Sequence, residues 1–236
     1  MKSSLPRSLA CFAILCPLFT VTGVLAGEPK QTAWEPLFDG KTLSGWEILE
    51  DDGKFFVEDG AIVGETAPGV KSSYLCTKES FDDFILELDF KVDEGLNSGV
   101  QIRSGTYEEE TTTLYMTGRL DLVSHTYGAG RLFGYQIEID TSDRAWTGGF
   151  YEQGRRGWLQ TLEYNEPARK AFQQGQWNHL RIAAIHDSFK TWLNGVPATD
   201  TRDCWSRSGR IGLQLHGSKQ PGKQVLFRNI RIKKVE

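Results

Sequence analysis

Polar side chains occupy every second position in residues 134–140, near the middle of the chain. They are Gln136, Glu138 and Asp140, and the residues between them are aromatic or aliphatic. A β-strand sends successive side chains to opposite faces, so the pattern predicts one apolar face and one face with polar groups about 7 Å apart. Carboxylates this close raise each other's pKa, which favours the floor of a polar cleft for a hydroxyl-rich ligand. A solvated outer face is the simpler alternative.

Two other segments show the same alternation. Gln101 and Arg103 alternate with Val100 and Ile102 in one of them, and Gln214 and His216 alternate with aliphatic residues 211, 213 and 215 in the other. If all three aliphatic faces pack against a second sheet, the polar faces form one surface. Its amides and guanidinium can bind sugar hydroxyls, and Glu138 and His216 are candidate acid–base catalysts. For His216, a hydrogen bond within a turn is the structural alternative.

Two aromatic residues follow the acidic segment. We predict that Tyr151 and Trp158 contact the ligand, because an aromatic platform beside a polar cleft suits the apolar face of a pyranose ring. A divalent metal held by Glu138, Asp140 and His216 is chemically possible. No ligand spacing in the chain requires one, so no metal site or cofactor is predicted.

The elements that must position these residues are short strands joined by turns. Asp59-Gly60 and Asn194-Gly195 stand between runs of strand-forming residues and predict tight hairpins. Further strands are predicted over residues 84–90, 177–185, 190–193, 210–216 and 224–233. No long stretch carries helical periodicity with caps. The pattern predicts an all-β domain of the sandwich or barrel type.

Residues 104–133 interrupt this rhythm. The interval contains three successive glutamates and the aromatic residues Tyr107, Tyr115 and Tyr127. Connections of this length in a domain are more often functional than incidental. We predict an inserted lid or rim over the polar face, with a small hairpin of its own. A disordered insertion is the alternative.

The N-terminus has the pattern of an export signal. Lys2 and Arg7 precede an apolar run over residues 9–21, and small residues around Ala26 resemble a cleavage site. The run is too short for a good membrane-spanning helix. We predict a signal peptide over residues 1–26, cleaved near Ala26, and a secreted or periplasmic domain over residues 27–236. No membrane insertion is expected after cleavage.

Charge and cysteine content restrict the partners. Without Lys2 and Arg7 the chain has 25 basic and 31 acidic residues, and no basic cluster. This balance argues against nucleic acid and anionic membranes as partners. Of the cysteines outside the signal, Cys76 and Cys204 could form one disulfide in an oxidising compartment. Two free thiols are the alternative.

A set of motifs covers almost the whole mature chain. It comprises PLFDGKTLSGW (36–46), NSGVQIR (97–103), GYQIEID (134–140), TGGFY (147–151), QWN (176–178), LNG (193–195), GRIGLQLHG (209–217) and VLFRNIR (225–231). In this order the motifs resemble the 3-keto-disaccharide hydrolase domain family. The resemblance implies a concanavalin A-like jelly roll, that is, a two-sheet antiparallel β-sandwich whose concave face binds carbohydrate.

The resemblance also implies a reaction on glycosides whose C3 hydroxyl has been oxidised to a ketone. The ketone acidifies the C2 proton, so a base can abstract it, the C1 substituent leaves by elimination, and water then adds. Under this reading Glu138 or His216 is the base, Arg103 with Gln136 stabilises the enolate, and Asp140 is the orienting group or the acid. Further predicted substrate-binding residues are Gln101, Gln214, Asn97, Tyr151 and Trp158.

Two other functions remain open from the sequence. Glu138-Ile139-Asp140 is similar to the Glu-x-Asp signature of jelly-roll endoglucanases, although Ser142 or Asp143 stands where their acid glutamate is expected. A non-catalytic, lectin-like sugar-binding module is the second alternative, because one sandwich fold serves both enzymes and binders.

Overall fold

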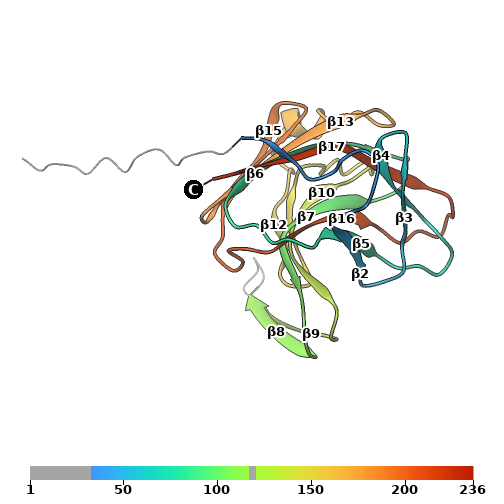
Figure 1. The fold of residues 1–236 in the computed structure, drawn as a ribbon. Helices are drawn as coiled ribbons and strands as arrows, with labels where there is room; N and C mark the ends of the chain where they lie inside the picture. The colour runs from blue at the N-terminus through green and yellow to red at the C-terminus, as the bar shows by residue number, and fades with distance from the viewer. Residues whose placement is uncertain (1–32, 117–120, 236) are drawn as a thin grey trace, which may run out of the picture.

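Two antiparallel sheets stack face to face in the computed structural model of this protein (Figure 1). The structure describes residues 33–116 and 121–235. Within these residues one sheet has eight strands, the other has seven, and a separate hairpin has two. The predicted all-β, two-sheet antiparallel sandwich is confirmed.

The eight-stranded sheet has the spatial order β15 (Val196–Arg202), β14 (Ser188–Leu193), β13 (Asn178–Ile185), β6 (Phe84–Val92), β17 (Gln224–Lys234), β4 (Ala61–Glu65) and β3 (Lys54–Glu58), and β1 (Glu35–Pro36) pairs with β17. The seven-stranded sheet has the order β12 (Gly157–Gln160), β11 (Phe150–Gln153), β10 (Leu132–Ile139), β7 (Ser98–Thr106), β16 (Arg210–Leu215), β5 (Ser73–Thr77) and β2 (Trp46–Leu49). The helix α1 (Glu166–Arg169) is a single turn.

The hydrophobic core fills the space between the two sheets. Each central strand contributes every second side chain, as the alternation predicts. The contributions of β6 are Phe84, Leu86, Leu88 and Phe90, and those of β10 are Tyr135, Ile137 and Ile139. The intervening residues of β10 and its neighbours therefore point to the outer face of the seven-stranded sheet.

Both predicted tight hairpins form. Asp59 and Gly60 join β3 to β4 with φ of 48° and 76°, and Asn194 and Gly195 join β14 to β15 with φ of 50° and 81°. Positive φ at both central residues is the requirement of the type I′ turn, which Asn or Asp followed by Gly meets at low steric cost. These turns fix the register of the outer strands.

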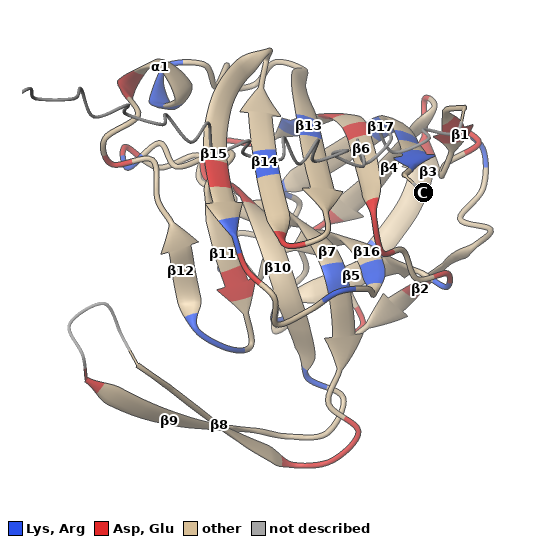
Figure 2. Ribbon diagram, turned by 90° about the vertical axis from the view of Figure 1, so that its left-hand side faces the viewer, with Lys and Arg blue, Asp and Glu red and all other residues tan. Residues whose placement is uncertain are grey.

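The interval between β7 and β10 contains the hairpin β8 (Thr111–Met116) and β9 (Leu122–Tyr127). It projects from the seven-stranded sheet on the side away from the eight-stranded sheet (Figure 1). Figure 2 shows the same hairpin passing below β11 and β12. The hairpin therefore stands beside the outer face that carries the polar residues.

The predicted signal peptide lies outside the described residues. Across residues 33–116 and 121–235, no helix is long and apolar enough to span a membrane. Cys76 is buried and Cys204 is exposed, and both are free thiols. Of the two alternatives that the cysteine count left open, the structure shows the free thiols, because the two residues lie in different environments of the fold.

Candidate functional site

A polar hollow of about 460 Å³, here called the cleft, opens on the outer face of the seven-stranded sheet. This volume lies within the range of small-ligand pockets. The residues that line the cleft are Ser72, Asn97, Arg131, Gln136, Glu138, Arg144, Tyr151, Gln153, Trp158, Gln214 and His216. Seven of the predicted site residues are in this set, whereas Gln101, Arg103 and Asp140 are not.

Glu138 lies at the floor of the cleft with only 6% of its surface exposed. Its carboxylate accepts hydrogen bonds from Asn97 Nδ2 at 2.7 Å and from Gln136 Nε2 at 2.8 Å. Burial raises the pKa of Glu138, and the charge of Asp140 acts in the same direction. The two amide hydrogen bonds and Arg144 oppose this shift without cancelling it. A carboxylate of raised basicity in a polar cleft can serve as a general base.

A chain of hydrogen bonds orients the Gln136 amide. Ser104 Oγ donates to Gln101 Oε1 at 3.1 Å, Gln101 Nε2 donates to Gln136 Oε1, and the Gln136 amide nitrogen then faces Glu138. Gly99 leaves room for this amide, because a Cβ at that position would lie 2.7 Å from Gln136 Cδ. Gln101 in the neighbouring strand β7 thus orients the Gln136 side chain so that its amide nitrogen, and not its oxygen, contacts the Glu138 carboxylate.

Gln101 has the predicted orientation but not the predicted exposure. It is fully buried, and its amide donates to the side chain of Gln136, its cross-strand partner. Its prediction as a direct substrate-binding residue is therefore wrong. The contact with Gln136 makes it a residue that positions the cleft floor.

Asp140 lies beyond the end of β10, so the strand alternation no longer applies to it. Its carboxylate accepts hydrogen bonds from the backbone and hydroxyl of Ser142, from Arg144 Nε at 2.8 Å and from Trp146 N. Burial opposes the ionisation of Asp140, but these hydrogen bonds outweigh it and lower its pKa. The prediction that Asp140 faces the cleft beside Glu138 is wrong. It holds the loop that follows the strand.

Arg144 is a cleft residue that the sequence reasoning missed. Its Nη2 lies 3.5 Å from Glu138 Oε1, and Asp140 holds its Nε. The guanidinium lies over the rings of Trp146 and Trp158, at 4.7 and 5.2 Å from their centroids. Asp140, four residues before Arg144, was the sequence feature that could have indicated an ion pair next to the cleft. The loop returns the arginine to the cleft and places a rigid cation beside the buried base.

Arg103 points away from the cleft, contrary to the prediction. Its φ is +47°, and the pairing of β7 with β16 shifts register next to it. A bulge of this kind turns a side chain out of the alternating pattern. The guanidinium is 1% exposed and donates to the carboxylate of Asp83 and to the carbonyls of Asp82, His186 and Ser206. These hydrogen bonds connect the segments that contain Asp82, His186 and Ser206.

Gln214 brings an unused acceptor into the cleft. Its Nε2 donates to Tyr74 Oη at 3.0 Å. Its Oε1 is buried and has no hydrogen-bond partner among residues 33–116 and 121–235. Buried polar atoms are almost always satisfied, so an unpaired one that lines a polar cleft indicates a ligand donor such as a hydroxyl.

His216 lies just after β16, at the exposed edge of the cleft. Its Nδ1 is 2.8 Å from the carbonyl oxygen of Gly217. A carbonyl can only accept, so the neutral ring carries its proton on Nδ1 and presents Nε2 as the basic nitrogen. The predicted alternative, a hydrogen bond within the turn, is thus present and also defines the tautomer.

Tyr151 and Trp158 form one wall of the cleft. Their rings pack edge to face with centroids 5.2 Å apart. Arg131 lies on the cleft lining too, held by Glu50 at 2.7 Å, together with Ser72 and Gln153. Ser72 and Arg131 lie in connections between strands and Gln153 is the last residue of β11, so the sequence offered no alternation from which to predict them.

Metal ligands are not gathered here. Among the residues that the structure describes, no group of three histidine, cysteine, aspartate or glutamate side chains is placed to hold a metal ion. The combination of Glu138, Asp140 and His216 does not form one because Asp140 turns into the following loop.

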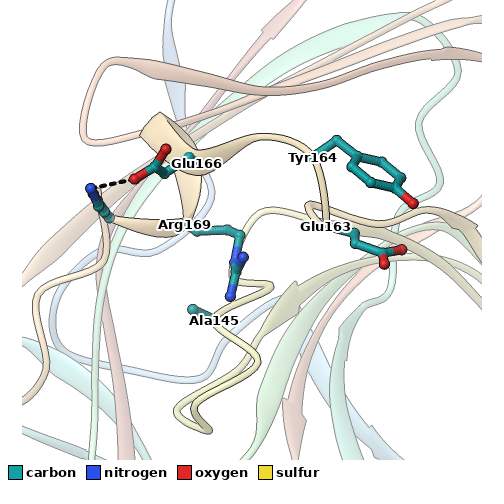
Figure 3. Close-up of a pocket in the computed structure, with 6 residues that line it drawn as sticks. Ala145, Glu163, Tyr164, Glu166 and Arg169 are labelled. Atoms are coloured by element: carbon teal, nitrogen blue, oxygen red, sulfur yellow. Dashed lines mark ion pairs between the residues drawn. The ribbon is translucent and has the colours of Figure 1, made fainter.

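A second hollow, of about 520 Å³, lies beside α1 and is shown in Figure 3. Its lining includes Ala145, Arg169 and the strongly exposed Tyr164. The ion pair at its rim, Lys170 with Glu166, is exposed to solvent and is an ordinary surface pair. This hollow lacks the buried base and the unpaired acceptor of the cleft.

The family relationship follows from a match to a family model. Residues 33–233 match the model of the 3-keto-alpha-glucoside-1,2-lyase-like domain. The chain belongs to this family. A 3-keto-disaccharide hydrolase from Bacteroides thetaiotaomicron is 26% identical to it over 237 residues, which cover 84% of this chain and 77% of that protein.

Solved structures share the fold of this lyase-like domain. A candidate glycosyl hydrolase from Parabacteroides distasonis has a TM-score of 0.54 at 19% identity and covers 86% of this chain and 94% of its own. The carbohydrate-binding module CBM66 from Bacillus subtilis has a TM-score of 0.52 at 17% identity, with 80% and 96% covered. At these identities the likeness establishes the sandwich architecture alone.

Proposed function

We propose that this protein cleaves the glycosidic bond of 3-keto-glycosides by elimination followed by hydration. The observation that carries the proposal is Glu138, a buried carboxylate of raised pKa between two amides and an arginine. The family match and the named activity of the Bacteroides relative support the choice of substrate class.

The elimination needs a base and a cation. Glu138 takes the C2 proton, and the electron pair of the C2–H bond moves toward the C3 ketone to give an enolate. Arg144 is the nearest cation for the developing negative charge, replacing Arg103 in that role. The enolate then expels the C1 oxygen, a C1–C2 double bond forms, and the acid on Glu138 returns its proton to the leaving oxygen.

The hydration completes the balance. His216 Nε2 takes a proton from water as the hydroxyl adds to C1, and the protonated ring supplies the proton that C2 regains. The free Oε1 of Gln214 accepts from a sugar hydroxyl, and Tyr151 and Trp158 face the ring. The products are a 3-keto sugar and the released alcohol.

An endoglucanase mechanism has less support. A retaining hydrolase needs two carboxyl groups about 5–5.5 Å apart across the scissile bond. Within the described residues, Glu138 is the single carboxylate that lines the cleft, because Asp140 turns away from it. A lectin-like role remains the second candidate, favoured by the aromatic wall and by the fold of the carbohydrate-binding module.

Turnover in heavy water separates these functions. The purified protein is incubated in D₂O with methyl 3-keto-α-glucoside, and the product is examined by NMR. Elimination and hydration put deuterium on C2 of the released 3-keto sugar, whereas direct displacement at C1 leaves C2 protonated. Glu138→Gln is expected to bind the glycoside and not release product, while the surface variant Glu163→Gln behaves as the parent. Binding without turnover in the parent would favour the lectin.

A further inference from the structure

The hairpin β8–β9 has two chemically different faces. Cross-strand pairs put Tyr115, His125 and Tyr127 on one face, because paired residues point the same way. Leu114, Met116 and Leu122 lie on the other face and are more than half exposed. The aliphatic face is turned to solvent, whereas Tyr115 and Tyr127 on the aromatic face are half-buried.

The aromatic face is a continuous row of rings. Tyr115 stacks with His125 at 5.9 Å between centroids, His125 lies 6.0 Å from Tyr127, and Tyr127 stacks with Tyr107 at 5.7 Å and 8° between planes. Successive positions on one face of a strand are about 7 Å apart, so the row spans roughly 14 Å along the hairpin. The row is therefore longer than the Tyr151–Trp158 pair in the cleft wall, whose ring centroids are 5.2 Å apart.

Tyr107 anchors the row to the body of the protein. Its ring lies 4.6 Å from that of Phe133 in β10, and its hydroxyl donates to the carbonyl of Gly154 after β11. The row therefore begins at strands that also carry the cleft. Figures 1 and 2 agree that the hairpin extends below these strands, on the outer side of the sheet.

The far end of the row is electrostatically coupled to the cleft wall. Burial raises the pKa of Tyr151, and the charges of Glu138 and Tyr115 raise it further. Tyr151 thus lies within electrostatic range of the buried base and of the hairpin. The row is therefore joined to the body of the protein at Tyr107, and its Tyr115 end interacts electrostatically with the cleft residue Tyr151.

We propose that Tyr115, His125 and Tyr127 form a distal sugar subsite, which holds the leaving-group sugar of a disaccharide whose reacting ring lies at Glu138. The inference rests on the proposed function for the identity of the reacting ring. Partly exposed aromatic rings suit the apolar face of a second pyranose, and the polar cleft suits the oxidised ring. Cross-strand stabilisation of the hairpin is the structural alternative.

The test compares two substrates with the same reacting ring. One is methyl 3-keto-α-glucoside, and the other is an α-linked glucose disaccharide oxidised at C3 of its non-reducing ring. Tyr115→Ala should lower kcat/KM roughly five- to tenfold on the disaccharide and leave the methyl glycoside unchanged. Leu114→Ala, the neighbour on the opposite face, should change neither. Tyr115→Phe retains the ring and should retain the disaccharide rate, which separates stacking from loss of the hairpin.

Binding provides a readout that does not depend on turnover. Calorimetric titration of the disaccharide into Glu138→Gln, with and without Tyr115→Ala, should show the same five- to tenfold difference. If the parent turns over neither glycoside but this difference persists, the proposed reaction fails and the subsite stands. Equal affinity in the two backgrounds, or an equal loss on both substrates, would overturn the subsite.

Discussion

Each sheet buries one glutamate on its outer face, and the two carboxyl groups have opposite acidities. Glu87 in β6 and Glu138 in β10 are each 6% exposed. Burial opposes ionisation of both, yet the pKa of Glu87 is lowered and that of Glu138 is raised. The exposed fraction alone therefore does not determine the direction in which the pKa of a buried glutamate shifts.

The partners of the two carboxylates explain the difference. Glu87 is paired with two guanidinium groups, from Arg181 and from Arg231 at 2.6 Å. Glu138 has two neutral amides, and its nearest cation, Arg144, lies at 3.5 Å and is shared with Asp140. Full ion pairing outweighs desolvation, whereas amide hydrogen bonds do not. The same residue type thus forms a structural ion pair on one face and, in the proposed mechanism, the catalytic base on the other.

Neutralising each glutamate gives the largest contrast. Glu138→Gln should lower turnover of a 3-keto-glycoside by about 10²- to 10⁴-fold, because the amide cannot act as the base. Glu87→Gln should leave turnover unchanged and destabilise the fold by about 1–2 kcal/mol, a figure reduced because its arginines are partly exposed. Kinetics and urea unfolding measure the two effects. Equal losses of turnover in both variants would remove the distinction between the sheets.

Removing an arginine from each glutamate should give a smaller contrast. Arg144→Ala is expected to lower kcat/KM by about 10²- to 10³-fold, since the enolate loses its nearest cation. Arg181→Ala is the matched control, because this arginine also lies near a tryptophan, Trp192, and pairs with a buried glutamate. A parent-like rate for Arg144→Ala would transfer the role of enolate stabiliser to another group.

Activity and stability should both fall as pH is lowered, but in different pH ranges, because the pKa of Glu138 is raised and that of Glu87 is lowered. The proposed reaction needs ionised Glu138, so kcat/KM should fall as pH drops through its raised pKa, and Arg144→Ala should move that fall to higher pH. Glu87 contributes stability above its unfolded pKa, which is lost as pH falls through its lowered folded pKa. The destabilisation in Glu87→Gln should thus shrink between about pH 7 and about pH 3, by urea unfolding. A constant difference would contradict the assigned ion pairing.

Regular strands made most of the fold and much of the site predictable. Within β10 and β16, alternation correctly placed Gln136, Glu138 and Gln214 on the outer face, opposite the core residues. It failed where the backbone departs from a strand. Arg103 has a positive φ at a bulge, and Asp140 follows the last residue of its strand.

Other site features depend on long-range packing. Gln101 has the correct face but is fully buried beside Gln136, a neighbour that only the pairing of two strands reveals. Arg144 enters the cleft because Asp140 and two tryptophan rings hold its guanidinium. Alternation describes one strand at a time, so it contains no information about either arrangement.

The direction of the amide hydrogen bonds has a consequence for the proton that Glu138 takes up. Asn97 and Gln136 both present N–H groups to the carboxylate, and neither of those groups can accept a proton from it. In the proposed reaction the newly formed O–H must therefore donate to an acceptor on the open side of the cleft, where the substrate would bind. The two amides would thereby direct the acid of the proposed reaction toward the departing alcohol.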